Sequence, residues 1–403
     1  MGDPDPAPAA PGGDKERDEA DREEKKPKVP ALVNGRYKTQ REIGAGSYSD
    51  VYLGVDTSSG DEVAMKFEWT KADKGARLLY EAKLYQSLPQ QDIPKVPRIF
   101  WYGRQGEYNI MVMELLGPSL EDLFRACNRR FSLKTTAMLG EQMVDLLEFV
   151  HAQGVLHRDI KPHNFLMGTG ERSRQVYVMD FGLAKRYLGE NGEHMVCTKK
   201  KGLTGTVRYT TLNVHRGLEP SRRDDLGAVG YVLMHFNLGR LPWQGIDAKS
   251  KRVKQRKIGK KKERVPNHEL CKNYPQEFAL FLDHCDKLEF DQAPDYGYLR
   301  KLMRDVCADL GLEWDLRFDW MHADGSQIEL EPKKLKGAGV ECGPEEQPAT
   351  KRRRHGWDCP GETGGAAAAL EAALEDDEGD YEYEYSSYES YDEEEEEEEE
   401  DEE

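Results

Sequence analysis

The chain has 403 residues and a formal net charge of −18 at pH 7. Residues 375–403 contain 20 acidic residues and no Lys or Arg, so the rest of the chain is close to neutral. No apolar run approaches the ~20 residues that span a bilayer, and the N-terminus lacks a basic-then-apolar signal pattern. We therefore expect a soluble intracellular protein, cytoplasmic, nuclear or both, with no membrane partner.

The cysteines argue against a disulfide framework and a cysteine-rich metal site. They are odd in number, widely scattered and nowhere spaced as Cys-x-x-Cys. Such a set fits a reducing compartment. The simplest interpretation is that they are small buried apolar residues. The seven are Cys127, Cys197, Cys271, Cys285, Cys307, Cys342 and Cys359.

Composition divides the chain into four segments. Residues 1–36 begin with Pro, Ala, Gly and mixed charge, which leaves little to bury and predicts disorder. Residues 37–321 have the composition of one large two-lobed domain. Residues 322–374 are expected to form a linker or extension, and residues 375–403 an acidic disordered tail.

Strands dominate the first part of the predicted domain. Leu78, Ala82 and Tyr85 recur at helical spacing and predict a helix, and a later strand stops at Gly117-Pro118. The strands are expected at residues 37–43, 51–56, 62–67 and 108–113.

Helices dominate the second part. Long segments that are apolar on one face predict helices over residues 131–150 and 224–238. Ser132 and the Asp224-Asp225 pair are the expected caps at their starts. A strand-rich front followed by a helical back predicts an α+β fold.

A glycine-rich stretch lies between two of the expected strands. Residues 44–51 read Gly-Ala-Gly-Ser-Tyr-Ser-Asp-Val, and such glycines let backbone amides approach phosphate groups. Because Ser49 occupies the third glycine position, an ordinary hairpin turn is an equal alternative for this stretch alone.

The next strand carries a candidate nucleotide contact. Side chains alternate along a strand, so Ala64 and Lys66 face the same side. Ala64 can then lie under an adenine while Lys66 reaches phosphate. Glu81, on the following helix, is the expected partner that holds Lys66 in place, although most such pairs of charges are solvated surface residues.

The decisive motifs are His-Arg-Asp-Ile-Lys-Pro-His-Asn at 157–164 and Asp-Phe-Gly at 180–182. Phosphoryl transfer needs an aligned nucleophile and neutralisation of spreading charge. Asp159 is expected to orient a substrate hydroxyl and accept its proton, with Lys161 facing the transferred group. Asn164 and Asp180 supply the oxygen ligands that Mg²⁺ prefers.

Four further strings resemble those of the casein kinase one family of serine/threonine protein kinases, more closely than those of tau-tubulin or vaccinia-related kinases. They lie at 114–124 (Glu-Leu-Leu-Gly-Pro-Ser-Leu-Glu-Asp-Leu-Phe), 203–209 (Leu-Thr-Gly-Thr-Val-Arg-Tyr), 221–226 (Ser-Arg-Arg-Asp-Asp-Leu) and 241–245 (Leu-Pro-Trp-Gln-Gly). The resemblance covers the whole predicted domain. It implies a bilobal kinase fold, with a small β-rich N-lobe and a larger helical C-lobe. It also implies that the enzyme uses ATP and Mg²⁺.

The resemblance also implies roles for individual residues. Met113 matches the gatekeeper, Glu114 and Leu116 match the hinge that binds adenine, and Ile43 and Val51 match the residues that sandwich the base. The implied catalytic residues are Asp159, Lys161, Lys66 and Glu81, and the implied metal ligands are Asn164 and Asp180. The implied ATP contacts are Ile43, Gly44, Ala45, Gly46, Ser47, Val51, Ala64, Lys66, Met113, Glu114 and Leu116.

Such kinases favour a Ser or Thr preceded by an acidic or phosphorylated residue. Arg208 and Lys254, with Gly245 nearby, match the family's anion site, and Arg158 with Lys185 is a candidate second site. Guanidinium groups suit phosphate because their N–H donors form a fork. The implied partners are therefore acidic or phosphorylated protein substrates.

A run of ten basic residues follows within the domain. It is expected to attract acidic peptides, with nuclear import and nucleic-acid binding as successively less favoured alternatives. The run comprises Lys249, Lys251, Arg252, Lys254, Arg256, Lys257, Lys260, Lys261, Lys262 and Arg264.

Three departures from the family pattern leave the reacting groups in place. His163 stands where an acidic residue is usual, Gly227-Ala228 replace a Glu-Ser pair, and Ser49 replaces a glycine. A pseudokinase scaffold, which binds partners without turnover, is the alternative from another class. Intact Lys66, Asp159 and Asp180 argue against it, and we expect an active monomeric kinase.

The acidic tail complements a groove that prefers acidic sequence. One hypothesis is that it folds back as a tethered competitive inhibitor, since tethering raises its effective concentration. The equal alternative is a solubilising or partner-binding polyanion.

Overall fold

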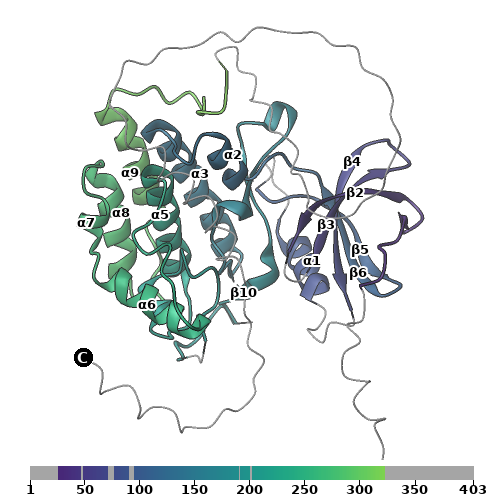
Figure 1. Cartoon of the computed structure of the whole chain (residues 1–403), viewed down its shortest axis with the longest axis horizontal. Helices are drawn as coiled ribbons and strands as arrows, with labels where there is room; N and C mark the ends of the chain where they lie inside the picture. The colour runs from purple at the N-terminus through teal and green to yellow at the C-terminus, as the bar shows by residue number, and fades with distance from the viewer. Residues whose placement is uncertain are drawn as a thin grey trace, which may run out of the picture.

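The computed structural model describes residues 26–46, 49–70, 77–89, 95–189, 191–199 and 202–322. In this part of the chain a β-rich lobe lies beside a larger helical lobe (Figure 1). The predicted α+β fold is confirmed. The linker and acidic tail expected after residue 322 lie outside the described residues, as does the chain before residue 26.

The β-rich lobe is built on one antiparallel sheet of six strands in the order β1-β2-β3-β4-β6-β5. Helix α1 (Arg77–Ser87) packs on it near β5 and β6. The expected strands are all present, with ends that differ by no more than two residues. The strands are β1 (Leu32–Val33), β2 (Tyr37–Ala45), β3 (Asp50–Asp56), β4 (Glu62–Trp69), β5 (Ile99–Gln105) and β6 (Tyr108–Glu114).

Strand β4 sends alternate side chains into two separate cores. Ala64 belongs to the large core that continues into the helical lobe. Val63, Met65 and Phe67 belong to a second cluster on the other face of the sheet. We call this cluster the outer core. Its fully enclosed members are Val33, Tyr37, Val63, Met65, Phe67, Tyr108, Ile110 and Val112.

The expectation that residues 1–36 are disordered is wrong for the part from residue 26 onward. Asn34 and Gly35 both have positive φ angles, 50° and 64°. With Arg36, whose N–H donates to the Val33 carbonyl at 3.0 Å, they form the three-residue connection between β1 and β2. Asn-Gly favours such a turn because both of its residues tolerate this conformation. The turn places Val33 in the outer core with no exposed surface, so burial of apolar area orders this segment.

The helical lobe surrounds α3, which packs against α5 and α9. Short antiparallel strand pairs β7–β10 and β8–β9 shape the loops at its junction with the sheet. The helices are α2 (Leu120–Ala126), α3 (Leu133–Ala152), α4 (Leu212–His215), α5 (Arg222–Leu238), α6 (Lys251–Glu263), α7 (Asn267–Leu270), α8 (Gln276–Lys287) and α9 (Tyr296–Asp309). The short strands are β7 (Val155–Leu156), β8 (Phe165–Met167), β9 (Val176–Val178) and β10 (Lys185–Arg186).

One of the two predicted helix caps is confirmed and the other is wrong. The Ser132 hydroxyl accepts a hydrogen bond from the Thr135 N–H at the start of α3. Helix α5, however, begins after Ser221 and not at the Asp224-Asp225 pair. Asp224 lies one turn inside the helix, where its carboxylate accepts the Ser221 N–H at 2.8 Å. An acid three residues after a cap is the arrangement of a capping box.

The cysteines of the described residues are all free, and three of them, Cys271, Cys285 and Cys307, are buried. Cys127 is half-buried, but Cys197 is exposed and does not follow the expected pattern. Within the described ranges, none of the helices combines the length and apolar character that crossing a membrane requires.

Candidate functional site

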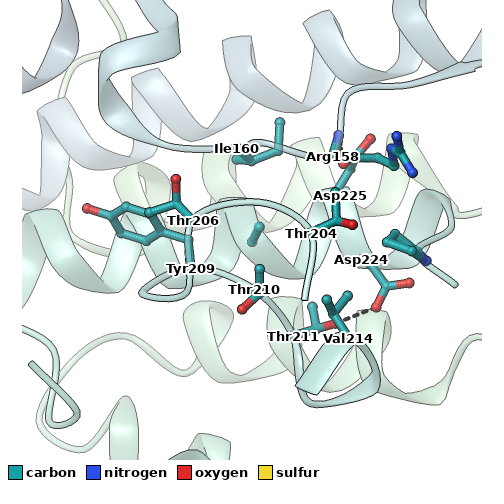
Figure 2. A pocket seen from close by; sticks show the side chains of 12 residues that line it. Arg158, Ile160, Thr204, Thr206, Tyr209, Thr210, Thr211, Val214, Asp224 and Asp225 are labelled. Carbon is teal, nitrogen blue, oxygen red and sulfur yellow. Dashed lines mark hydrogen bonds between the residues drawn. The ribbon is translucent and has the colours of Figure 1, made fainter. Parts of the chain in front are cut away.

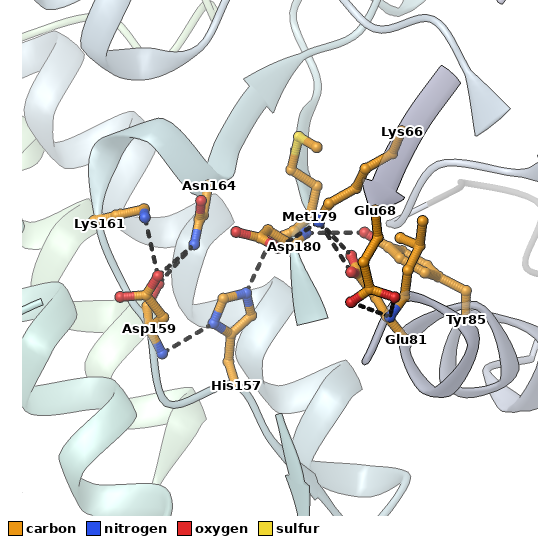
Figure 3. Close-up of polar contacts among 11 residues, drawn as sticks. Lys66, Glu68, Glu81, Tyr85, His157, Asp159, Lys161, Asn164, Met179 and Asp180 are labelled. Carbon is orange, nitrogen blue, oxygen red and sulfur yellow. Dashed lines mark hydrogen bonds and ion pairs between the residues drawn. The ribbon is translucent and has the colours of Figure 1, made fainter. Parts of the chain in front are cut away.

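Lys66 pairs with two carboxylates at the junction of the two lobes (Figure 3). Its Nζ lies 2.9 Å from Oε2 of Glu81 and 2.8 Å from Oδ1 of Asp180. Strand β4 supplies the lysine, α1 supplies the glutamate, and the turn after β9 supplies the aspartate. The structure thus joins three residues that the sequence analysis had placed in one site.

The three charges shift one another's pKa values. Burial opposes the charge of Lys66, yet Asp180 and Glu81 raise its pKa. Burial also opposes ionisation of Asp180, but the positive charges of Lys66 and Lys161 lower its pKa. Burial raises the pKa of Glu81 to about 7 against the attraction of Lys66, and repulsion from Asp180 adds to the rise. Lys66 and Lys161 together therefore keep Asp180 ionised, whereas Glu81 is left ready to bind a proton.

We predict a pH-dependent stability that depends on Glu81. Its folded-state pKa of about 7 exceeds the ordinary value of 4.5, so the folded protein binds the extra proton between these values. The resulting stabilisation is complete below pH 4.5 and is lost as pH rises through about 7. The melting temperature of wild type, relative to that of Glu81→Gln, should therefore fall from pH 4.5 to 7. A difference that stays constant with pH contradicts this assignment.

Asp180 is held in an unusual backbone conformation. Its φ of 66° and ψ of 71° lie in the left-handed region, which costs a non-glycine residue about 1–2 kcal/mol. The Asp180 N–H donates to the Tyr85 hydroxyl at 2.9 Å, and the Phe181 ring packs edge-on against Tyr85 at 5.0 Å. These contacts hold the carboxylate toward Lys66.

The Asp159 carboxylate is bound by three side chains and one backbone amide. Thr206 donates its hydroxyl at 2.7 Å and its N–H at 3.1 Å to Oδ1. Lys161 Nζ lies 3.0 Å from Oδ2, and Asn164 Nδ2 donates to Oδ2 at 3.2 Å. Asp159 is only 3% exposed, so these donors fix a buried carboxylate in one orientation.

His157 connects the Asp159 loop to the residue that precedes Asp180. Its Nδ1 accepts the Asp159 N–H at 3.2 Å, which leaves Nε2 to donate to the Met179 carbonyl at 3.0 Å. Asp225, on α5, accepts the backbone N–H groups of His157 and Arg158, each at 2.8 Å. The loop is thereby held by the centre of the helical lobe.

The residues expected to surround a nucleotide lie on the sheet and on the chain that leaves it. Ala64 pairs with Met113 across β4 and β6, and Val51 pairs with Lys66 across β3 and β4. The β2–β3 register shifts between Glu42 and Gly44, which places an irregularity at Ile43. The remaining expected contacts, Ala45, Gly46, Glu114 and Leu116, follow on the same strands and on the chain after β6, and Ser47 lies outside the described residues.

The expected second anion site contains a carboxylate of the chain itself. Lys185 Nζ lies 3.0 Å and Arg158 Nη1 lies 3.6 Å from Oε1 of Glu219. Glu219 is 1% exposed. The structure therefore brings Arg158 and Lys185 together as predicted, but around an internal acid that offsets part of their positive charge.

The expected first anion site lies where the segment at 206–210 meets the helical lobe. Arg208 is buried, and its backbone carbonyl accepts a hydrogen bond from Trp243 Nε1 at 2.8 Å. Gly245, two residues after Trp243, has a φ of 72°, which favours glycine. Lys254 lies in the first turn of α6, after the Ser250 cap. Arg208 and the Trp243–Gly245 turn are thus neighbours.

The assignment of Lys262 to a basic surface run is wrong. Lys262 is 2% exposed and donates to the backbone carbonyls of Val207 and Thr210. Burial lowers the pKa of its amine well below the ordinary value. A count of charges does not reveal which of them a helix directs inward.

A small pocket lies behind the 206–210 segment (Figure 2). Threonine side chains and the start of α5 line it, together with Arg158, Ile160 and Tyr209. Ala228, one of the departures from the family pattern, also lines it. Gly227, the other residue of that pair, lies so close to Thr211 that a Cβ there would come within 2.8 Å of the threonine methyl.

Two residues that contact the site were not singled out from the sequence. Thr206 binds Asp159, and Glu219 binds Arg158 and Lys185. Thr206 lies within the 203–209 string, in which the resemblance implies a role only for Arg208. Glu219 is a single acid two residues before the 221–226 string. Neither has a local pattern that reveals its distant partner.

Two side chains at the junction of the two lobes offer oxygen atoms of the kind that Mg²⁺ prefers. Asp180 keeps a side chain that is 35% exposed while Lys66 binds one of its oxygens. Asn164 lies on the neighbouring loop and adds an amide oxygen. No group of three or more His, Cys, Asp or Glu in the described chain forms a metal cluster of its own. This set fits a hard cation that takes one or two protein ligands and completes its coordination with substrate phosphates.

The family comparison agrees with this geometry. Residues 37–294 match the family model described as a protein kinase domain. The match includes both carboxylates that surround Lys66 and the whole Asp159 loop. Helix α9 and the chain up to residue 322 lie beyond it.

Proposed function

Because the chain belongs to the protein kinase family, we propose that it is a serine/threonine kinase similar to the casein kinase one family. Its proposed substrates are proteins in which an acidic or phosphorylated residue precedes the target Ser or Thr. The observation that carries the proposal is the convergence of Lys66, Asp159 and Asp180 at one junction. Phosphotransfer from ATP to protein substrates follows from the family itself.

Asp159 is proposed to orient the substrate hydroxyl and accept its proton. Four donor groups fix its carboxylate, so little reorganisation is needed when the hydroxyl arrives. Lys161, 3.0 Å from this carboxylate, is proposed to face the transferred phosphoryl group and attract its negative charge.

Lys66 is proposed to hold the phosphates of ATP, with Glu81 keeping the amine in place. Asp180 and Asn164 are proposed to bind Mg²⁺, which neutralises phosphate charge when bound. Ala64 and Met113, paired across two strands, support a role under the adenine, with Ile43 and Val51 around it. Glu114 and Leu116 are proposed to supply backbone groups to its edge.

The proposed preference for acidic substrates rests on Arg208, Lys254 and the Gly245 turn. A guanidinium presents a fork of N–H donors that matches phosphate oxygens. The internal acid Glu219 makes the Arg158 and Lys185 pair the weaker of the two proposed anion sites.

The test is transfer from labelled ATP with Mg²⁺ to three matched peptides. One has a phosphoserine three residues before the target Ser, one lacks it, and one has Tyr as the target. We expect the primed Ser peptide to have the highest kcat/KM and the Tyr peptide to show no transfer. Asp180→Asn is the control and should abolish transfer to all three.

Two outcomes contradict the proposal. Equal transfer to primed and unprimed peptides removes the anion preference, although the enzyme remains a kinase. ATP binding without transfer to any peptide favours a scaffold that binds partners without turnover. Ser49 and His163 are then the first residues to restore to the family pattern.

A further inference from the structure

Lys262 stands apart from the other basic residues of α6 because its side chain points inward. Its amine lies 5.2 Å from the ring centre of Tyr231 and 5.1 Å from that of Trp243. It donates to the Val207 carbonyl at 2.8 Å and to the Thr210 carbonyl at 2.6 Å. A lysine is almost never this buried unless its N–H groups are satisfied.

The carbonyls that Lys262 binds flank Arg208. The carbonyl of Arg208 itself accepts the Trp243 indole N–H. Donors from α6 and from the Trp243 turn thus hold three of the four carbonyls between residues 207 and 210. At the other end of this segment, Thr206 binds the Asp159 carboxylate.

We propose that Lys262 is a positioning residue that sets Arg208 relative to Asp159 and thereby determines selectivity for substrates with an upstream phosphate. This inference rests on the proposed function, because Arg208 is there the phosphate contact. Lys262 joins the helix that carries Lys254 to the segment that carries Arg208, so it sets the spacing of the two cations.

The amine can do this in either protonation state. Burial lowers its pKa, and an uncharged amine still has two N–H groups, which is the number that its two carbonyl partners require. Loss of these donors leaves the Thr210 carbonyl without its Lys262 partner, whereas the Val207 carbonyl also accepts the Thr210 hydroxyl at 3.1 Å. The Thr210 end of the segment is therefore expected to move first.

The experiment compares Lys262→Met with wild type on the primed and unprimed Ser peptides. Methionine keeps an unbranched chain and removes every donor. We expect kcat/KM for the primed peptide to fall about 10- to 100-fold, as expected for a misplaced contact. The unprimed peptide and the KM for ATP should change little. Lys262→Arg, which keeps donors, should restore part of the preference.

Two further variants show whether the effect depends on the position of Lys262 and whether it survives if Lys262→Met does not fold. Lys272→Met makes the same substitution at an exposed site beside Glu269 and should leave the primed-to-unprimed ratio of kcat/KM unchanged. Trp243→Phe removes the donor to the Arg208 carbonyl and keeps a ring, and it should lower the primed-to-unprimed ratio of kcat/KM. Trp243→Phe therefore tests the inference if Lys262→Met does not fold.

Amide hydrogen exchange across residues 206–211 gives a readout that does not depend on peptide choice. Exchange should be faster in Lys262→Met than in wild type, with the Asp159 loop unchanged. If wild type shows no preference for priming, the proposed function fails, while faster exchange still supports anchoring by Lys262. The inference is overturned if Lys262→Met lowers kcat/KM equally for both peptides. It is also overturned if amide exchange and the primed-to-unprimed ratio of kcat/KM both stay at the wild-type values.

Discussion

Asp159→Asn is expected to lower kcat by about 10²- to 10⁴-fold, the usual contribution of a positioned proton acceptor. An amide has nearly the same shape as a carboxylate, but it is a very weak base and does not attract the cation of Lys161. The amide oxygen can still accept the two hydrogen bonds from Thr206, which go to a single carboxylate oxygen. Asn164 loses its bond to the other oxygen but keeps the one to the Asp159 backbone carbonyl. The loss should therefore appear in catalysis, with a much smaller effect on the KM for ATP.

The measurement is single-turnover transfer to the primed Ser peptide, together with ATP affinity measured separately. Asp145→Asn is the matched control, since this carboxylate lies on α3 with a side chain that is 47% exposed and paired with Lys95. It should stay close to wild type in both readouts. An Asp159→Asn enzyme within about tenfold of wild type would show that another group accepts the proton.

Trp320→Ala is expected to lower the free energy of unfolding by about 3–5 kcal/mol, the range for loss of a buried Trp. The Trp320 side chain has no exposed surface. It stacks on Phe318, with ring centres 4.7 Å apart, and contacts Phe131, with centres 5.4 Å apart. Removal of the indole opens a cavity at the start of α3, which the surrounding helices fill only in part.

Chemical denaturation measures this loss of unfolding free energy, and two variants serve as comparisons. Trp320→Phe keeps a ring and removes an indole N–H that has no partner among the described residues, so it should cost much less. Leu310→Ala changes a residue that is 48% exposed and should cost little. If all three variants have equal stability, the chain after the family match is not part of the folded domain.

Sequence reasoning was most successful where chemistry requires particular residues. Phosphoryl transfer constrains Lys66, Asp159 and Asp180 so strongly that the sequence alone predicts their convergence. The strands and long helices followed from apolar periodicity. Helix α5 begins at Arg222, two residues earlier than predicted, because Ser221 caps it and Asp224 binds back to that cap.

The failures share one physical cause, namely that burial depends on distant parts of the chain. The composition of residues 26–36 suggests disorder, yet Val33 closes the outer core. The Asn34-Gly35 turn was the local signal for this. Lys262 resembles its exposed neighbours in sequence and differs only because α6 turns it toward Tyr231 and Trp243. Glu219 is similarly defined by Arg158 and Lys185, both more than 30 residues before it.

The two faces of β4 serve different purposes, and this has a genetic consequence. Ala64 packs in the large core and Lys66 pairs with Glu81 and Asp180, whereas Met65 is fully enclosed in the outer core. In a library of single substitutions along this strand, the type of defect should alternate from one codon to the next. Changes at Lys66 should give abundant but inactive protein, while polar changes at Met65 should lower abundance and leave the surviving molecules active.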